Sequence, residues 1–129
     1  PPAIAGSLNT AELLERVQGD RELLAEIVQL FDSGLPATLQ GLRQAIARED
    51  AMEIARTAHA LKGSVGNFGR GAALRAVEEM ENSAKESDMA RTAKAFVVVE
   101  RELKELLAML EPFRAPAIEA ATAEKTVIN

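Results

Sequence analysis

Apolar residues recur at helical spacing along most of the chain. Between residues 20 and 47 they lie mostly three or four positions apart and form one stripe, the pattern of a helix buried on one side; the members are Leu24, Ile27, Val28, Phe31, Leu35, Leu39, Leu42 and Ile46. Three further stripes occupy residues 51–68, 73–84 and 96–110, and a short pattern runs from Asn9 to Gly19. The spacing predicts four long helices preceded by a short one.

Side chains that can cap a helix N-terminus stand just before four of these five patterns; the candidates are Asn9, Asp20, Asp50, and Ser87 or Asp88. Only short connections separate the long patterns, and short connections make antiparallel neighbours. The sequence therefore predicts an all-α fold, an antiparallel four-helix bundle with the short N-terminal helix across one end.

Glycine and proline mark where these helices bend or end. We expect the short helix to end at Gly19, and the 51–68 helix to continue through Phe68 and stop at the glycines that follow. Pro36 removes one backbone hydrogen bond in the first long pattern, yet the apolar period continues on both sides of it. We expect a kinked helix there, with a break into two segments as the alternative.

Composition divides the chain into three parts. Residues 1–8 are rich in proline, alanine and glycine and resemble the end of a linker. Residues 9–111 carry the helical patterns. Residues 112–129 begin with Pro112 and are rich in alanine, and they are predicted to form a C-terminal tail, with a loosely attached extra turn of helix as the alternative. Because the chain lacks an initiator methionine, we expect it to have been processed or cut from a longer protein.

Composition also excludes several classes of function. The 129 residues include no cysteine, so a disulfide framework, a thiolate nucleophile and a zinc–thiolate site are all excluded. The formal net charge of −5 disfavours binding to a nucleic-acid backbone, and no apolar run approaches the roughly 20 residues that span a bilayer. We expect a cytoplasmic monomer that contacts neither nucleic acid nor membrane.

The chain has a single histidine, His59, on the polar side of the 51–68 stripe. At about 100° per residue it lies roughly 140° from the centre of that stripe, so its imidazole is predicted to face solvent. Lys62, Gly63 and Gly66 follow at one-turn spacings on a neighbouring part of the helix surface. Glycine inside a helix costs about 1 kcal/mol relative to alanine, which suggests that the missing side chains give access to the ring. A solvated histidine with incidental glycines is the alternative.

Other chemistry finds little support. A metal site in a helical bundle needs several inward carboxylates and histidines, with a glutamate three residues before each histidine, and Arg56 occupies that place here. No glycine-rich loop of the G-x-x-x-x-G-K type is present, so ATP binding is not expected. The chemistry that is left is imidazole as a nucleophile, since a neutral ring near physiological pH has one free lone pair.

The run from Ala58 to Gly69 reads A-H-A-L-K-G-S-V-G-N-F-G. It resembles the phosphorylation motif of histidine-containing phosphotransfer (HPt) domains, which is H-x-x-K-G followed by small residues and a glycine. Lys62, Gly63 and Gly69 fall on the lysine and the glycines of that motif without a gap.

The similarity extends from Asn9 to about Leu110. It includes the Gly19-Asp20 turn and the pair Met80-Glu81, where the family usually has Leu-Glu. The sequence departs from the family pattern at Gly71, where a larger polar residue is common, and at Ala73, where leucine is usual and Leu74 stands next door. This departure leaves the start and the packing of the following helix open.

The resemblance implies a four-helix bundle and a phosphoryl carrier in a two-component phosphorelay. His59 would accept the phosphoryl group, and Lys62 would supply positive charge to its oxygens, with an ordinary surface lysine as the alternative. The resemblance also implies that Mg²⁺ and the phosphoryl-bearing aspartate belong to a partner, the receiver domain of a response regulator. This domain would then be no enzyme and would hold no cofactor of its own.

Glu81 is the candidate for orienting the ring. The resemblance places it on the adjacent helix, where a glutamate or glutamine often contacts the histidine. A carboxylate that accepts a hydrogen bond from Nδ1 would leave Nε2 to attack. A merely solvated glutamate is the alternative.

Two alternative functions are consistent with the sequence. One is the phosphorylated domain of a chemotaxis-type histidine kinase, and a sensor histidine kinase is the second class of partner that the resemblance allows. The other is a helical adaptor whose histidine is never phosphorylated; the combination of His59, Lys62 and Gly63 disfavours it. Whether the domain is a free relay protein or a piece of a hybrid kinase stays open.

Overall fold

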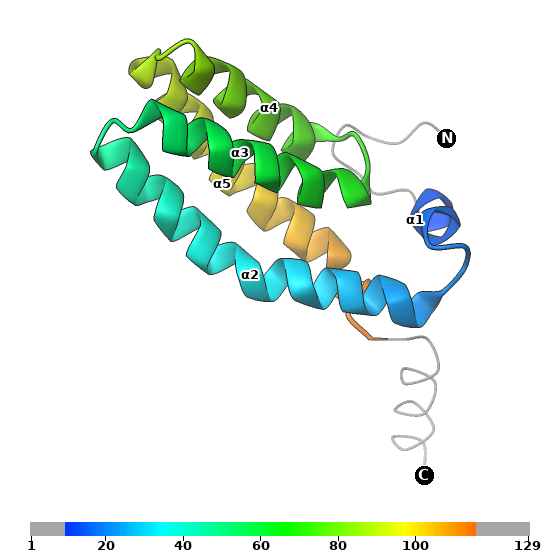
Figure 1. The fold of residues 1–129 in the computed structure, drawn as a ribbon. Coiled ribbons are helices and arrows are strands. Elements are labelled where there is room, and N and C mark those ends of the chain that lie inside the picture. Colours follow the sequence, from blue (N-terminus) through cyan, green and yellow to red (C-terminus); the bar gives the residue numbers. More distant parts are fainter. Residues whose placement is uncertain (1–9, 116–129) are drawn as a thin grey trace.

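The computed structural model describes residues 10–115, and in that range the regular elements are all helical. They are α1 (Thr10–Arg16), α2 (Arg21–Ala47), α3 (Ala51–Val65), α4 (Ala72–Lys85) and α5 (Met89–Leu110), with 3₁₀ turns η1 (Gly66–Phe68) and η2 (Glu111–Phe113). Helices α2 to α5 form the bundle, in which α2 and α4 each pack against α3 and α5, and α1 lies at one end (Figure 1). The predicted all-α fold is confirmed for the described residues.

Aspartate side chains start three of the four bundle helices. Asp20, Asp50 and Asp88 accept hydrogen bonds from the backbone N–H groups of Leu23, Glu53 and Arg91 at 2.9, 3.0 and 3.1 Å. Each bond satisfies a donor that the first turn would otherwise leave unpaired. Of the two candidates for α5, Asp88 is therefore the cap, while the fourth candidate, Asn9, lies outside the described residues.

Helix α2 is continuous across Pro36. It runs for 27 residues with Pro36 inside it, so the alternative of two separate segments is wrong, and Figure 1 shows the ribbon of α2 bending along its length. Phe31, Leu35 and Leu42 are buried on the two sides of the proline. Burial of one continuous apolar stripe therefore keeps the helix whole although one backbone hydrogen bond is missing.

Two helices end earlier than the sequence predicts. Helix α1 stops at Arg16, and the chain turns through Gln18 and Gly19, whose φ angles are 55° and 78°. Helix α3 stops at Val65 and tightens into η1, which ends at Phe68 and is followed by Gly69 with a φ of 120°. Glycine is a poor helix former, and short 3₁₀ turns are frequent at helix ends, so the sequence around Gly66 favours the tighter turn.

The start of α4 accommodates the two positions, Gly71 and Ala73, at which the sequence departs from the family pattern. Gly71 takes the N-cap position, and the side chains of Ala73 and Leu74 are both buried. Further along α4, Val77, Met80 and Ala84 are also buried. The helix therefore keeps a continuous apolar face against its neighbours.

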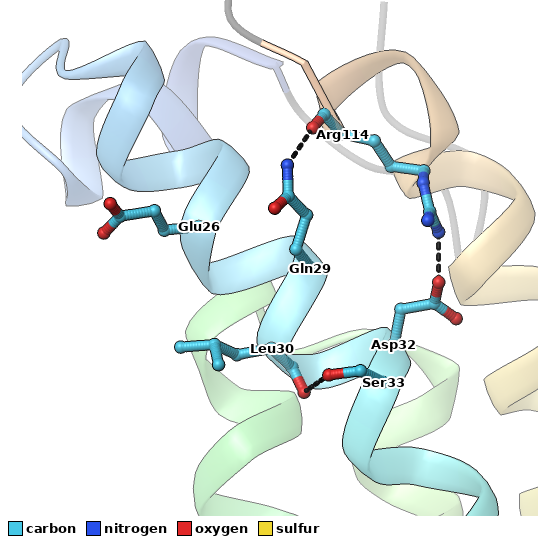
Figure 2. A pocket seen from close by; sticks show the side chains of 6 residues that line it. All are labelled: Glu26, Gln29, Leu30, Asp32, Ser33 and Arg114. Carbon is cyan, nitrogen blue, oxygen red and sulfur yellow. Dashed lines mark hydrogen bonds and ion pairs between the residues drawn. The ribbon is translucent and has the colours of Figure 1, made fainter.

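The chain packs on the bundle beyond Leu110. In Figure 2, Gln29 of α2 donates a hydrogen bond of 2.6 Å to the backbone oxygen of Arg114, and Asp32 pairs with the Arg114 guanidinium. Phe113 is half-buried against the core. A surface pocket of about 700 Å³ is lined by Arg114 and by residues of α2, among them Gln29, Leu30 and Asp32 (Figure 2). The first residues of the segment predicted to be a tail, 112–115, are thus attached to α2; residues 116–129 lie outside the described range.

Between residues 10 and 115, no helix combines the length and the apolar composition that a membrane span requires.

Candidate functional site

His59 projects outward from the middle of α3. The buried face of this helix consists of Ile54, Ala58, Leu61 and Val65, and the His59 side chain is 69% exposed on another side. This is the direction that the helical spacing predicts. The ring can therefore be reached by a molecule from solution.

Glu81 on α4 contacts the other charged side chains of the site. Its side chain is only 2% exposed, and its Oε2 atom lies 2.8 Å from Nδ1 of His59. The ammonium of Lys62, one turn after His59, lies 3.0 Å from Oε1. The structure thus brings together three of the residues singled out from the sequence, namely His59, Lys62 and Glu81.

A fourth member of the cluster, Lys85, was not predicted from the sequence. Its ammonium lies 3.1 Å from Oε2 of Glu81, four residues earlier on the same helix. The i,i+4 spacing of Glu81 and Lys85 was the available signal. This spacing points to the site only once Glu81 is known to contact His59.

Glu81 is ionised across the physiological range. Burial alone raises the pKa of this carboxyl, but hydrogen bonds from Lys62, His59 and Lys85 outweigh burial and bring the pKa down to about 2. An ionised carboxylate can only accept hydrogen bonds, so Nδ1 of His59 must be the donor. The lone pair of the neutral ring is then on Nε2, the nitrogen on the other side of the ring from Nδ1.

Gly63, one turn after His59 on α3, and Gly66, which begins η1, both lie at open positions of the surface. At Gly63, and likewise at Gly66, a Cβ atom would meet no atom of the described chain within 4 Å apart from its immediate neighbours and its own helix backbone. Packing inside this chain therefore does not require either glycine. Gly66 has a structural contact through its backbone, because its carbonyl accepts a hydrogen bond of 3.3 Å from Arg16 on α1.

Across the described part of the chain, no group of three or more histidine, cysteine, aspartate or glutamate side chains is arranged to hold a metal ion. The charged groups in contact with one another at His59 are the Glu81 carboxylate and the ammonium groups of Lys62 and Lys85. This set suits an anion at the ring, since the cations outnumber the carboxylate.

The comparison with protein families agrees with the fold. The sequence model described as Hpt domain matches residues 26–111, which is more than half of the chain and includes His59, Lys62, Glu81 and Lys85. The chain therefore belongs to the HPt domain family, whose members carry phosphoryl groups in phosphorelays and work with receiver domains. Neither the curated proteins nor the solved structures yield a significant match.

The low pKa of Glu81 predicts a pH-dependent contribution to stability. The folded-state pKa of about 2 lies below the ordinary value of 4.5, so the stabilisation is complete above the unfolded pKa and is lost as the pH falls toward 2. Glu81→Gln removes this titration. In urea unfolding, the difference in unfolding free energy between wild type and Glu81→Gln should be largest above about pH 5 and shrink steadily below it. An equal difference at pH 7 and pH 3 would contradict the ionised, hydrogen-bonded carboxylate.

Proposed function

We propose that this HPt domain accepts a phosphoryl group on Nε2 of His59 from the aspartyl phosphate of one receiver domain and passes it to the aspartate of another. The observation that carries the proposal is the contact of Nδ1 with a buried, ionised carboxylate beneath an exposed ring. That contact fixes which nitrogen holds the proton and which one holds the lone pair.

In the proposed transfer, one bond to phosphorus forms as another breaks. The Nε2 lone pair attacks phosphorus, the bond from phosphorus to the aspartate oxygen breaks, and the aspartate leaves as a carboxylate. The ring keeps its Nδ1 proton and gains a positive charge, which the neighbouring Glu81 carboxylate offsets. In the reverse direction the ring leaves as a neutral imidazole with its electron pair. Transfer in both directions is what a carrier requires.

Lys62 supplies positive charge to the phosphoryl oxygens. Its side chain is 33% exposed, and its ammonium is held 3.0 Å from Oε1 of Glu81, on the opposite carboxylate oxygen from the ring. An ammonium has three donors, so it can keep this contact and also bind an incoming oxygen. Phosphoryl transfer depends mainly on placement and on neutralising oxygen charge.

The remaining parts of the reaction belong to the partner. We expect the receiver domain to contribute the aspartate and Mg²⁺, and this domain to work without a cofactor. The open surface at Gly63 and Gly66, next to the exposed ring, is where we expect the receiver to approach. A sensor histidine kinase is the second class of partner to be tested.

Replacing the histidine should abolish phosphorylation without unfolding the protein. His59→Gln should gain no acid-labile phosphoryl group from a panel of phosphorylated receivers, while wild type gains one. Its helical circular dichroism should be retained, because the imidazole is mostly exposed. Labelling of His59→Gln would contradict the carrier function, and a wild type that no receiver or kinase labels would favour the adaptor.

Removing the charge of Lys62 should affect transfer more than stability. Lys62→Ala should slow phosphotransfer several-fold or more, because one cation near the oxygens is lost. The melting temperature should fall, because Oε1 of the buried Glu81 carboxylate loses its contact with Lys62, but the protein should stay folded since Oε2 keeps its contacts with His59 and Lys85. Lys104→Ala, which removes an exposed lysine of α5, is the matched control. Equal transfer rates for the two variants would make Lys62 an ordinary surface residue.

Adding a side chain at Gly63 should move stability and activity in opposite directions. Gly63→Gln should stabilise α3 by up to about 1 kcal/mol, because the position is helical and open, yet it should block the receiver and abolish transfer. Gly63→Ala gains a similar helix propensity without the long side chain and should retain more transfer. Thermal melting and phosphotransfer rates measured together test this. Full transfer by a stable Gly63→Gln protein would show that the receiver does not approach over this surface.

A further inference from the structure

Helix α2 carries a second line of uncharged residues beside the stripe that packs into the core. These residues recur at alternating spacings of four and three positions, which keeps them on one face of the helix. We call this line the outer face of α2; its members are Leu23, Ile27, Leu30, Gly34, Ala37, Gly41 and Gln44. Ile27 is half-buried, and the others are exposed. The bundle therefore leaves the outer face open to a partner.

Large apolar side chains are in contact with water on the first half of the outer face. Leu30 is 72% exposed and Leu23 is 41% exposed, and Figure 2 shows the Leu30 side chain pointing away from Arg114. Single exposed leucines are ordinary on a protein surface, but these two lie on one face with Ile27 between them. Covering them removes apolar surface from water, which favours association.

Two glycines lie on the second half of the outer face without a role in the bundle. At Gly34, and likewise at Gly41, a Cβ atom would meet no atom of the described chain within 4 Å apart from its immediate neighbours and its own helix backbone. Alanine at either position would favour the helix more than glycine does. Glycine does, however, allow another backbone to approach closely. A second helix packed on this face gives both glycines a use.

The outer face is complementary to itself. Its first half carries bulky residues, and its second half carries small ones up to Gly41. If two copies of α2 pack antiparallel about a two-fold axis near residue 32, every bulky residue lies opposite a small one. The pairs across the two copies are Leu23 with Gly41, Ile27 with Ala37, and Leu30 with Gly34. A parallel pair would instead set leucine against leucine and glycine against glycine, which leaves voids.

The edge of the outer face is compatible with the same register. This edge consists of Glu26, Ser33 and Gln40, which are all exposed. In the antiparallel pair Glu26 lies near Gln40 of the second copy, whose amide can donate a hydrogen bond to the carboxylate, and Ser33 lies near its own equivalent. Like charges therefore do not meet along this edge.

We propose that the chain forms a symmetric dimer through an antiparallel pair of α2 helices, with a second copy of the chain on the outer face. The dimer replaces the monomer expected from the sequence, and it does not depend on phosphotransfer. A standard interface buries about 800 Å² on each partner, and one line of residues on a single helix offers less. We therefore expect a weak dimer that forms as the protein concentration rises.

A receiver domain is the alternative occupant of the outer face. A receiver has no need of the two-fold register, and the isolated chain would then stay monomeric. Variants of the outer face would slow phosphotransfer without changing the molecular mass in solution. Mass and transfer measured on the same variants distinguish the two occupants.

The first experiment is sedimentation equilibrium of the full chain over a wide range of concentration. Wild type should change from monomer to dimer, and Leu30→Glu and Gly34→Leu should each dimerise at least about tenfold more weakly. The double variant Leu30→Ala, Gly34→Leu should regain dimer, because large and small residues exchange places and still face each other. Val97→Glu, which alters a residue 63% exposed on α5, is the control and should resemble wild type.

Circular dichroism keeps this experiment interpretable. All these variants should retain the helical signal of wild type, because Leu30 and Gly34 are exposed. A monomeric wild type at every concentration would overturn the proposal, and slower phosphotransfer by Leu30→Glu in that case would assign the face to the receiver. Dimerisation of Leu30→Glu equal to wild type would also overturn it, as would a double variant no better than Gly34→Leu.

A second experiment tests the antiparallel register by cross-linking. The chain has no cysteine, so single cysteines report one contact each. A mixture of Leu23→Cys and Gly41→Cys should form a disulfide-linked dimer on oxidation, while neither variant alone should do so. In the antiparallel pair each cysteine lies roughly 27 Å along the helix from its own equivalent, too far for a disulfide. Efficient cross-linking of Gly41→Cys with itself would show a parallel pair and contradict the proposed register.

Discussion

The site depends on one buried carboxylate. Glu81 is almost wholly removed from solvent, yet it is ionised, because an imidazole and two ammonium groups bind its two oxygens. A buried charge is tolerated only when it is paired and hydrogen-bonded. In the proposed function the pairing would also determine the chemistry, since the carboxylate would hold the proton of His59 on one nitrogen and leave the other as the nucleophile.

The bundle supplies the geometry that this pairing requires. Helices α3 and α4 pack side by side, and the apolar faces of the two helices fix their rotation, with Ala58 and Leu61 buried on α3 and Val77 and Met80 buried on α4. His59 and Lys62 follow directly after Ala58 and Leu61, and Glu81 follows directly after Met80. The core packing therefore places the carboxylate at the edge of the core, where exposed donors can cover it.

The sequence predicts the helices, their aspartate caps and the outward direction of His59, because these depend on local spacing. Glu81 came from the family resemblance and not from periodicity, since its contact crosses from α4 to α3. Lys85 was missed for the same reason: its local pair with Glu81 gains meaning only from a contact between helices. The early end of α3 at Val65 was not predicted, because the apolar spacing continues to Phe68 although the backbone changes to a 3₁₀ turn. The attachment of Arg114 to Gln29 and Asp32 is a contact between distant parts of the chain, and the apolar spacing of one helix cannot predict it.

The central claim is that Glu81 holds the Nδ1 proton of His59 so that Nε2 carries the phosphoryl group. The most direct measurement is heteronuclear NMR of the phosphorylated domain with ¹⁵N-labelled histidine, observed through ¹H, ¹⁵N and ³¹P. Our account predicts that phosphorus couples to Nε2 and that Nδ1 bears a proton, with that proton signal lost or shifted in Glu81→Gln. Phosphorus bonded to Nδ1, or an Nδ1 proton signal that is the same in Glu81→Gln as in wild type, would contradict it.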